Sequence, residues 1–135
     1  MIVCDGAGGM DAVTGRILIV EDEETLRESL KRIFVREGYE VDCVGSSESA
    51  LSTIQQTVYD VVVSDIMLPG MDGLELLKRC MASNPRLAII IITAYASIDS
   101  AVTAIKEGAY DYLVKPVMHE EIKDIIRRAL QERYS

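Results

Sequence analysis

Short apolar runs alternate with amphipathic segments along the chain from Arg16 onward. In each amphipathic segment, apolar residues recur three or four positions apart, which is the spacing of one helix face. We therefore predict five strands that alternate with five helices. The predicted strands are the runs 17–20, 41–44, 61–63 (ending at Ser64-Asp65), 88–92 and 110–114.

The polar and glycine residues between these segments mark where the helices begin and end. Gly38 and Gly108 are predicted to stop the first and fourth helices, Ser46 or Ser47 to cap the second, and Asp72 to cap the third. The apolar positions that define the helices are Leu26, Leu30, Ile33 and Phe34; Ala50, Leu51, Ile54 and Val58; Leu74, Leu77 and Met81; Ile98, Val102 and Ile105; and Ile122, Ile125, Ile126, Ala129 and Leu130.

The order of the elements indicates the fold class. Largely continuous apolar strands are typical of a sheet that is covered on both faces. A helix in every crossover predicts parallel strands with right-handed connections, and hence a doubly wound α/β sheet. Five units are too few for an eight-fold barrel, and no fixed sequence period suggests a solenoid.

Length and charge narrow the function. The chain has 135 residues, of which 49% are hydrophobic, so one globular domain is expected. The net charge of −8 argues against nucleic-acid binding by this segment and against an anionic membrane surface as partner. The longest apolar run, 87–92, is too short to cross a bilayer.

The chain ends and the rarer residues add little further chemistry. Residues 1–15 are glycine-rich and aperiodic, so we predict a flexible N-terminal tail followed by a domain over residues 16–134. Three cysteines without metal-type spacing favour a reduced, cytoplasmic setting, with Cys43 in a strand and Cys80 in a helix. His119 falls where a helix begins and is interpreted as a solvent-facing residue.

Candidate chemistry gathers just after the predicted strands. Parallel doubly wound sheets bind ligands at the carboxyl ends of their strands. Three carboxylates, one hydroxyl and one ammonium are expected to converge there: Glu21, Asp22, Asp65, Thr93 and Lys115.

Most of these residues also have an ordinary structural explanation, since Thr93 alone suits a plain strand-end hydroxyl and Lys115 before a proline suits a surface lysine. Acids after a strand often cap the next helix or favour its positive end, which is the preferred interpretation for Glu23 and Glu24 and also suits Glu21 and Asp22. Asp65 differs because no helix start follows it directly. The combination of five such positions on one rim is what favours a functional site.

Neighbouring carboxylates repel one another unless a cation lies between them. Mg²⁺ is held by one or two carboxylates together with waters and phosphate oxygens. A carboxylate can also act as a nucleophile and form an acyl phosphate, with cations neutralising the phosphoryl oxygens. The residue types therefore suit Mg²⁺-dependent phosphoryl transfer.

At these positions the sequence resembles the receiver domain of bacterial two-component response regulators. The matching motifs are ILIVEDE at 17–23, VVVSDIMLPGMDGLELL at 61–77, ITAYAS at 92–97 and GAYDYLVKP at 108–116. The sequence of residues 93–116 is especially similar to that of receivers attached to sigma-54-dependent transcription activators. The resemblance implies a flavodoxin-like five-stranded sheet with the strand order 2-1-3-4-5.

The resemblance also implies a role for each residue. It makes Asp65 the phosphoacceptor, with Mg²⁺ (or Mn²⁺) held by Asp22, Asp65 and the backbone carbonyl of Met67. By the same resemblance, Glu21 contacts the metal through water, and Thr93 and Lys115 contact the phosphoryl group. Tyr112 is the side chain that changes rotamer on activation, and the small Ala94 leaves room for Thr93 to move. Pro116 is the proline that follows a cis peptide bond.

As a receiver, the chain is expected to be a phosphorylation-controlled switch that catalyses only its own phosphorylation and dephosphorylation. Its expected partners are a sensor histidine kinase or phosphotransfer protein, an output domain that controls transcription, and a second copy on phosphorylation. The alternative is a single-domain phosphorelay or docking receiver without a DNA-binding output. A Mg²⁺-dependent hydrolase is disfavoured because Met67 stands where such enzymes carry a second aspartate.

Overall fold

The computed structural model describes residues 14–133 as a five-stranded parallel sheet with five helices. The strands are β2 (Arg16–Val20), β3 (Glu40–Val44), β4 (Val61–Asp65), β5 (Ala88–Thr93) and β6 (Asp111–Val114). The helices are α1 (Glu24–Arg36), α2 (Ser47–Gln56), α3 (Gly73–Ser83), α4 (Ile98–Lys106) and α5 (His119–Arg133). The predicted tail over residues 1–15 lies, except for Thr14 and Gly15, outside the described residues, as does Cys4.

The spatial strand order is β3-β2-β4-β5-β6. Counted along the chain, this is the predicted order 2-1-3-4-5. The order reverses at β2, which pairs with β3 on one side and with β4 on the other. Because a crevice for ligands forms at such a reversal, the carboxyl ends of β2 and β4 are the expected position of a binding site.

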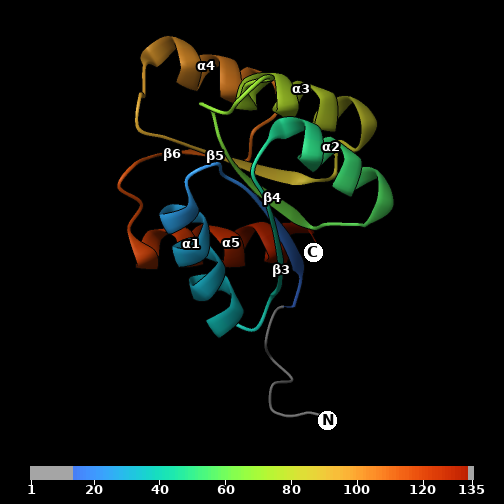
Figure 1. Ribbon diagram of the computed structural model, residues 1–135, viewed down its shortest axis with the longest axis vertical. Helices are drawn as coiled ribbons and strands as arrows, with labels where there is room; N and C mark the ends of the chain where they lie inside the picture. Colours follow the sequence, from blue (N-terminus) through green and yellow to red (C-terminus); the bar gives the residue numbers. More distant parts are fainter. Residues whose placement is uncertain (1–13, 134–135) are drawn as a thin grey trace.

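Helices cover both faces of the sheet (Figure 1). Helices α1 and α5 lie on one face, and α2, α3 and α4 lie on the other. Each face has its own apolar core. Phe34 and Ile126 belong to the first core, whereas Leu77 and Cys80 belong to the second. Burial on both faces explains why the central strands β4 and β5 are almost continuously apolar.

Local signals set the helix ends as predicted. Ser46, rather than Ser47, caps α2 by accepting a hydrogen bond from the Ser49 amide, and Asp72 caps α3 in the same way from Glu75. Gly38 and Gly108 follow α1 and α4 with φ of 95° and 105°, the left-handed region that glycine tolerates.

The second helix is shorter than its apolar pattern predicts. It ends at Gln56, and Thr57 is extended with φ −134° and ψ 137°. Val58 therefore lies beyond the helix and is 79% exposed, while Tyr59 is buried in its place. The last strand likewise begins at Asp111 rather than at Tyr110.

Helix α4 forms where predicted, but its apolar stripe faces away from the sheet. Ile98, Val102 and Ile105 are exposed by 83%, 46% and 56%, and the buried residue of the helix is Ala104. Helical periodicity locates the helix, yet it does not say which side packs on the sheet. The small Ala104 makes the close contact instead.

Cys43 in β3 is half-buried and Cys80 in α3 is buried, and both are free thiols, as expected. His119 is the exposed first residue of α5. Among residues 14–133, no helix has both the length and the apolar character required to cross a membrane.

Tyr59 provides a test of the packing at the end of α2. Its buried hydroxyl donates a 2.6 Å hydrogen bond to Asp42, and burial together with this bond raises the pKa of Tyr59 from 10.0 to about 12. A raised folded-state pKa stabilises the fold below pH 10, and this contribution is lost as the pH rises towards 12.

Tyr59→Phe is therefore expected to be about 1 kcal/mol less stable than wild type below pH 10. The deficit should shrink and then reverse as the pH rises towards 12, because only the wild type has a phenol whose contribution is lost there. Urea unfolding of both proteins at the two pH values measures this. A deficit of the same size at both would contradict the assignment.

Candidate functional site

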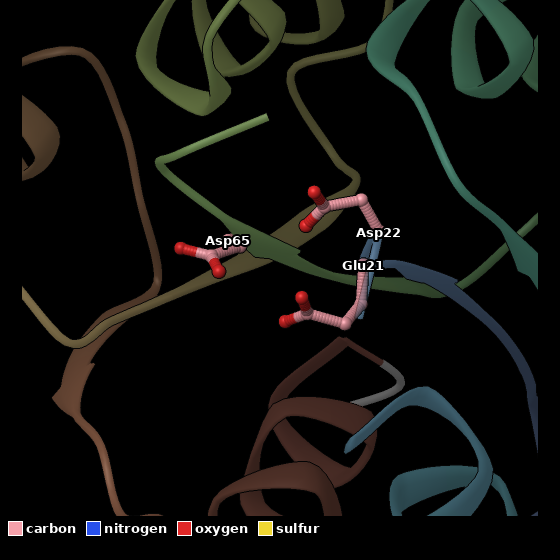
Figure 2. A group of neighbouring side chains, drawn as sticks. All are labelled: Glu21, Asp22 and Asp65. Carbon is pink, nitrogen blue, oxygen red and sulfur yellow. The ribbon is translucent and has the colours of Figure 1, made fainter. Parts of the chain in front are cut away.

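The predicted residues meet at the carboxyl ends of β2, β4, β5 and β6. Figure 2 shows Glu21 and Asp22, at the end of β2, beside Asp65 at the end of β4. One carboxylate oxygen from each of the three lies within 4.8 Å of the others. Glu21 and Asp65 are buried, whereas Asp22 is exposed. Three negative charges are therefore held together at the edge of the sheet.

Asp65 is the last residue of β4 and is only 5% exposed. Its Oδ2 accepts a 2.6 Å hydrogen bond from Lys115 Nζ, and its Oδ1 accepts a 3.1 Å bond from the Met67 amide. A carboxylate oxygen has two lone-pair directions, so each oxygen keeps one for a further contact. Two donors thus orient the side chain, and each of its oxygens can still accept a further contact.

Glu21 is the most deeply buried acid of the site, at 1% exposure. Its Oε1 accepts a 3.2 Å hydrogen bond from Lys115, and its Oε2 accepts a 3.1 Å bond from the Glu23 amide. Burial raises the pKa of Glu21 above 4.5, and the charge of Asp65 raises it further. The hydrogen bond from the Glu23 amide and the charge of Lys115 lower this pKa, but they do not cancel the effect of burial. The ionised form is therefore held at an energetic cost.

Lys115 follows β6 and lies between the two buried acids. Burial lowers the pKa of its ammonium, but the hydrogen bond to Asp65 and the charges of Glu21 and Asp65 outweigh it and raise the pKa above 10.5. The Lys115–Pro116 peptide is cis. The Lys115 amide also donates to the Thr93 carbonyl at 2.8 Å, which ties this loop to the end of β5.

Asp22 projects from the loop that leads into α1. The Arg27 guanidinium donates to the backbone carbonyl of Glu21 at 3.0 Å and to that of Asp22 at 3.5 Å. Glu23 occupies the N-cap position of α1, but its side chain makes no cap hydrogen bond. Of the two structural interpretations of Glu23, a capping hydrogen bond is therefore wrong, whereas its place at the positive end of the helix agrees with the other; Glu24 lies in the first helical turn as expected.

The remaining predicted residues lie on the α4 side of the site. Thr93 is fully buried, and its Oγ1 accepts a 3.0 Å hydrogen bond from the Tyr95 amide, while Ala94 between them is exposed. Tyr112 on β6 is half-buried, and its hydroxyl lies 2.6 Å from Ser100 Oγ on α4.

Ser100 belongs to the capping box that begins α4. Its amide donates to Ser97 Oγ, and its own Oγ accepts from the Ser97 amide. The contact with Tyr112 thus joins β6 to the first turn of α4. The sequence analysis did not single out Ser100 or Arg27 as residues of the site. The spacing of Ser97 and Ser100 is a visible capping signal, but nothing along the chain shows that Tyr112 reaches it.

One ammonium does not balance three carboxylates. A hard divalent cation fits this donor set, because it takes oxygen ligands and neutralises the remaining negative charge. Mg²⁺ with such ligands keeps open positions for water and phosphate oxygens. The geometry is therefore suited to placing a phosphoryl group beside Asp65.

Comparison with known proteins identifies the family of the chain. The family model described as response regulator receiver domain matches residues 17–127. Regulatory protein AtoC from Escherichia coli (strain K12) is 40% identical over 116 residues, which cover 86% of this chain and 25% of that protein. DctD, the C4-dicarboxylate transport transcriptional regulatory protein of Rhizobium meliloti, is 33% identical, with 87% of this chain and 25% of its own length covered.

Solved structures show the same fold. A CheY-like receiver domain protein from Methanospirillum hungatei superimposes with a TM-score of 0.86 at 34% identity, covering 88% of this chain and 95% of that one. The beryllofluoride-activated NtrC4 receiver domain dimer gives 0.84 at 36% identity, with 87% and 98% covered.

The chain spans about a quarter of the length of these curated relatives. The match to the family model nevertheless covers the sheet, the acidic site and most of α5. The chain therefore belongs to the family of response regulator receiver domains, the phosphorylation-controlled switches of two-component signalling.

Proposed function

We propose that Asp65 is the phosphoacceptor of this receiver and that a phosphohistidine on a sensor kinase or phosphotransfer protein is the donor. A carboxylate oxygen of Asp65 forms the new bond to phosphorus, while the bond from phosphorus to the donor imidazole breaks and the imidazole leaves with that electron pair. The observation that carries the proposal is the position of Asp65, buried between the Lys115 ammonium and the Met67 amide beside two further acids.

The other residues act on the transferred group. Lys115 neutralises a phosphoryl oxygen and Thr93 contacts another through its hydroxyl. Asp22, Asp65 and the Met67 carbonyl would hold Mg²⁺ directly, and Glu21 would do so through water. A bound Mg²⁺ (or Mn²⁺) would neutralise charge on the phosphoryl oxygens. The chain then needs no separate catalyst and promotes only its own phosphorylation and dephosphorylation.

We further propose that the protein acts in the cytoplasm and controls transcription. AtoC is named a regulatory protein and DctD a transcriptional regulatory protein, and each is about four times as long as the matched segment. The exposed Ile98, Val102 and Ile105 on α4 supply an apolar face on which a second phosphorylated copy can pack. The alternative, a receiver without a DNA-binding output, uses the same site and differs only in its partner.

The central test is metal-dependent labelling of the purified chain. Acetyl phosphate with Mg²⁺ is expected to add one phosphoryl group, detected as a single mass increment. Excess EDTA should prevent it, because the acids then repel the incoming anion. Labelling that is equally fast without divalent metal would overturn the proposed site.

Mg²⁺ is also expected to stabilise the fold. Binding only to the folded state stabilises by mass action, about 1.4 kcal/mol at ten times the dissociation constant. Thermal unfolding with increasing Mg²⁺ measures this, and an Asp22→Asn variant should respond less. Equal shifts in wild type and variant would point to non-specific salt effects instead.

The proposed switch runs from Thr93 to Tyr112. In the structure, Thr93 Oγ1 accepts a hydrogen bond from the Tyr95 amide, and the Tyr112 hydroxyl is hydrogen-bonded to Ser100. A phosphoryl group on Asp65 draws the Thr93 hydroxyl inward, which vacates space for the Tyr112 ring and releases Ser100. Moving such a balance from 1:99 to 99:1 takes about 5.5 kcal/mol of differential binding.

Beryllofluoride is therefore expected to change NMR shifts from Ile98 to Tyr112, and Thr93→Ala should blunt that change. Thr25→Ala, at an exposed position in α1, is the matched control and should leave it intact. Shift changes in wild type that stay confined to residues around Asp65 would contradict the route.

A further inference from the structure

The loop between β4 and α3, residues 66–72, is held from the side by helix α2. Ser47 Oγ donates a 2.7 Å hydrogen bond to the Met71 carbonyl, and Glu48 Oε2 accepts a 3.3 Å bond from the Met71 amide. Two consecutive residues in the first turn of α2 thus satisfy both backbone groups of one loop residue. Such paired contacts fix the position and direction of the peptide chain at Met71.

Ser47 is not needed to cap its own helix, because Ser46 already does so. Its side chain is nevertheless fully buried, with an exposed fraction of 0%. A buried hydroxyl requires a partner, and the Met71 carbonyl is the one it has. The side chain of Ser47 is therefore directed at the loop.

The fit around Glu48 is also close. Gly70, immediately before Met71, has φ 75°, and a Cβ at that position would lie 2.8 Å from Glu48 Oε2. Glycine allows both the left-handed turn and the approach of the carboxylate. The loop conformation and the α2 contact thus depend on each other.

The same loop carries one arm of the phosphorylation site. Met67 donates its amide to Asp65 Oδ1, and the Gly73 amide closes the loop by donating to the Ile66 carbonyl at 2.8 Å. A Cβ at Gly73 would lie 2.1 Å from the Asp65 carbonyl oxygen, so the two ends of the loop pack directly on each other. Between them, the Met67 carbonyl is the backbone ligand proposed for Mg²⁺, and Met71 is the point where α2 grips the loop.

We propose that Ser47 and Glu48 are positioning residues for the Mg²⁺ site, acting through Met71 to hold the loop that presents the Met67 carbonyl. This inference rests on the proposed function of Asp65 and Met67. Groups bonded directly to a metal ligand commonly affect affinity tenfold or more. Ser47 and Glu48 act one step further away, through Met71, so an effect of about a few-fold is expected. Without the grip, the loop samples other conformations and the carbonyl must be ordered each time the metal binds.

The alternative is that these side chains only stabilise α2. Ser46→Ala separates the two explanations, because Ser46 caps the same helix by accepting from Ser49 and is the immediate neighbour of Ser47. Glu48→Gln is the conservative variant, since its amide oxygen can still accept from the Met71 amide although the charge is gone. Glu48 is exposed, so its variants are expected to fold even if Ser47→Ala does not.

The experiment measures the Mg²⁺ dissociation constant by calorimetry and the initial rate of labelling by acetyl phosphate across Mg²⁺ concentrations. Ser47→Ala and Glu48→Ala are each expected to weaken Mg²⁺ binding, by about a few-fold for Ser47→Ala, because its hydroxyl acts on the Met67 carbonyl through Met71. Labelling at saturating Mg²⁺ should stay near the wild-type rate, because Asp65 and Lys115 are untouched. Glu48→Gln should restore most of the affinity, and Ser46→Ala should lower only the melting temperature.

Unchanged Mg²⁺ affinity in Glu48→Ala and Ser47→Ala, while Asp22→Asn weakens it, would overturn the positioning role and leave the proposed function standing. Equal weakening in Ser46→Ala would also overturn it, since helix stability would then be the cause. A wild-type chain that neither binds Mg²⁺ nor accepts phosphate would instead refute the proposed function.

Discussion

Asp65→Asn is expected to abolish labelling by acetyl phosphate. Asparagine has nearly the same shape, but its single carbonyl oxygen can keep only one of the two hydrogen bonds that the Asp65 oxygens accept, from Lys115 or from the Met67 amide. A neutral amide is a far weaker nucleophile than a carboxylate, so no acyl phosphate forms. Mass spectrometry of the intact chain should show only unmodified protein after the wild type is fully labelled.

Asp72→Asn is the matched control for this change. Asp72 lies at the other end of the same loop, is exposed, and accepts a 2.9 Å hydrogen bond from the Glu75 amide, a capping role that asparagine can keep. It should be labelled like wild type. Labelling of Asp65→Asn at the wild-type rate would move the phosphoacceptor to another residue.

Strand-end reasoning predicts most of this site because it depends on topology alone. Parallel strands place their carboxyl ends on one edge, so Asp65, Thr93 and Lys115 meet although they are far apart in the chain. The strand order and the individual roles came from the family motifs, since periodicity does not rank strands in space. The sequence therefore predicts which residues meet and not how they bond.

Packing decides what periodicity leaves open. The pattern of α4 predicts a helix, but the sheet accepts the small Ala104 and leaves Ile98 and Val102 exposed. At the end of α2, the extended Thr57 breaks the period and Tyr59 fills the core instead of Val58. In both places a tertiary contact overrides a local preference.

Long-range polar contacts are the other class that the sequence does not reveal. The hydroxyl of Tyr112 reaches Ser100 on another element, and Ser47 reaches Met71 across 24 positions. A serine near a helix start is ordinarily interpreted as a cap. Only the structure distinguishes Ser46, which caps, from Ser47, which grips the neighbouring loop.

Lys115→Met is expected to destabilise the metal-free fold by about 3 kcal/mol near neutral pH. Methionine keeps much of the length of the side chain but removes the only ammonium in hydrogen-bond contact with Asp65 and Glu21 among the described residues. Two buried carboxylates then face each other and Asp22 without compensation. Labelling should slow as well, because the phosphoryl oxygens lose a neutralising group.

The pH dependence identifies the cause. Burial already raises the pKa of Glu21 above 4.5, and a raised carboxyl pKa means that stability is present at low pH and lost as the pH rises through it. Removing the ammonium takes away a charge that lowers the pKa of Glu21, so this pKa rises further and the deficit of Lys115→Met should shrink as the pH falls towards 4.5. It should shrink again above pH 10.5, where wild-type Lys115, whose pKa is raised, loses its charge and its contribution to stability.

Urea unfolding of wild type and Lys115→Met across this pH range measures how the deficit varies. Lys78→Met, at an exposed position in α3, is the control and is expected to stay within about 0.5 kcal/mol of wild type throughout. A deficit that does not vary with pH would mean that lost packing, rather than two unpaired carboxylates, is the cause.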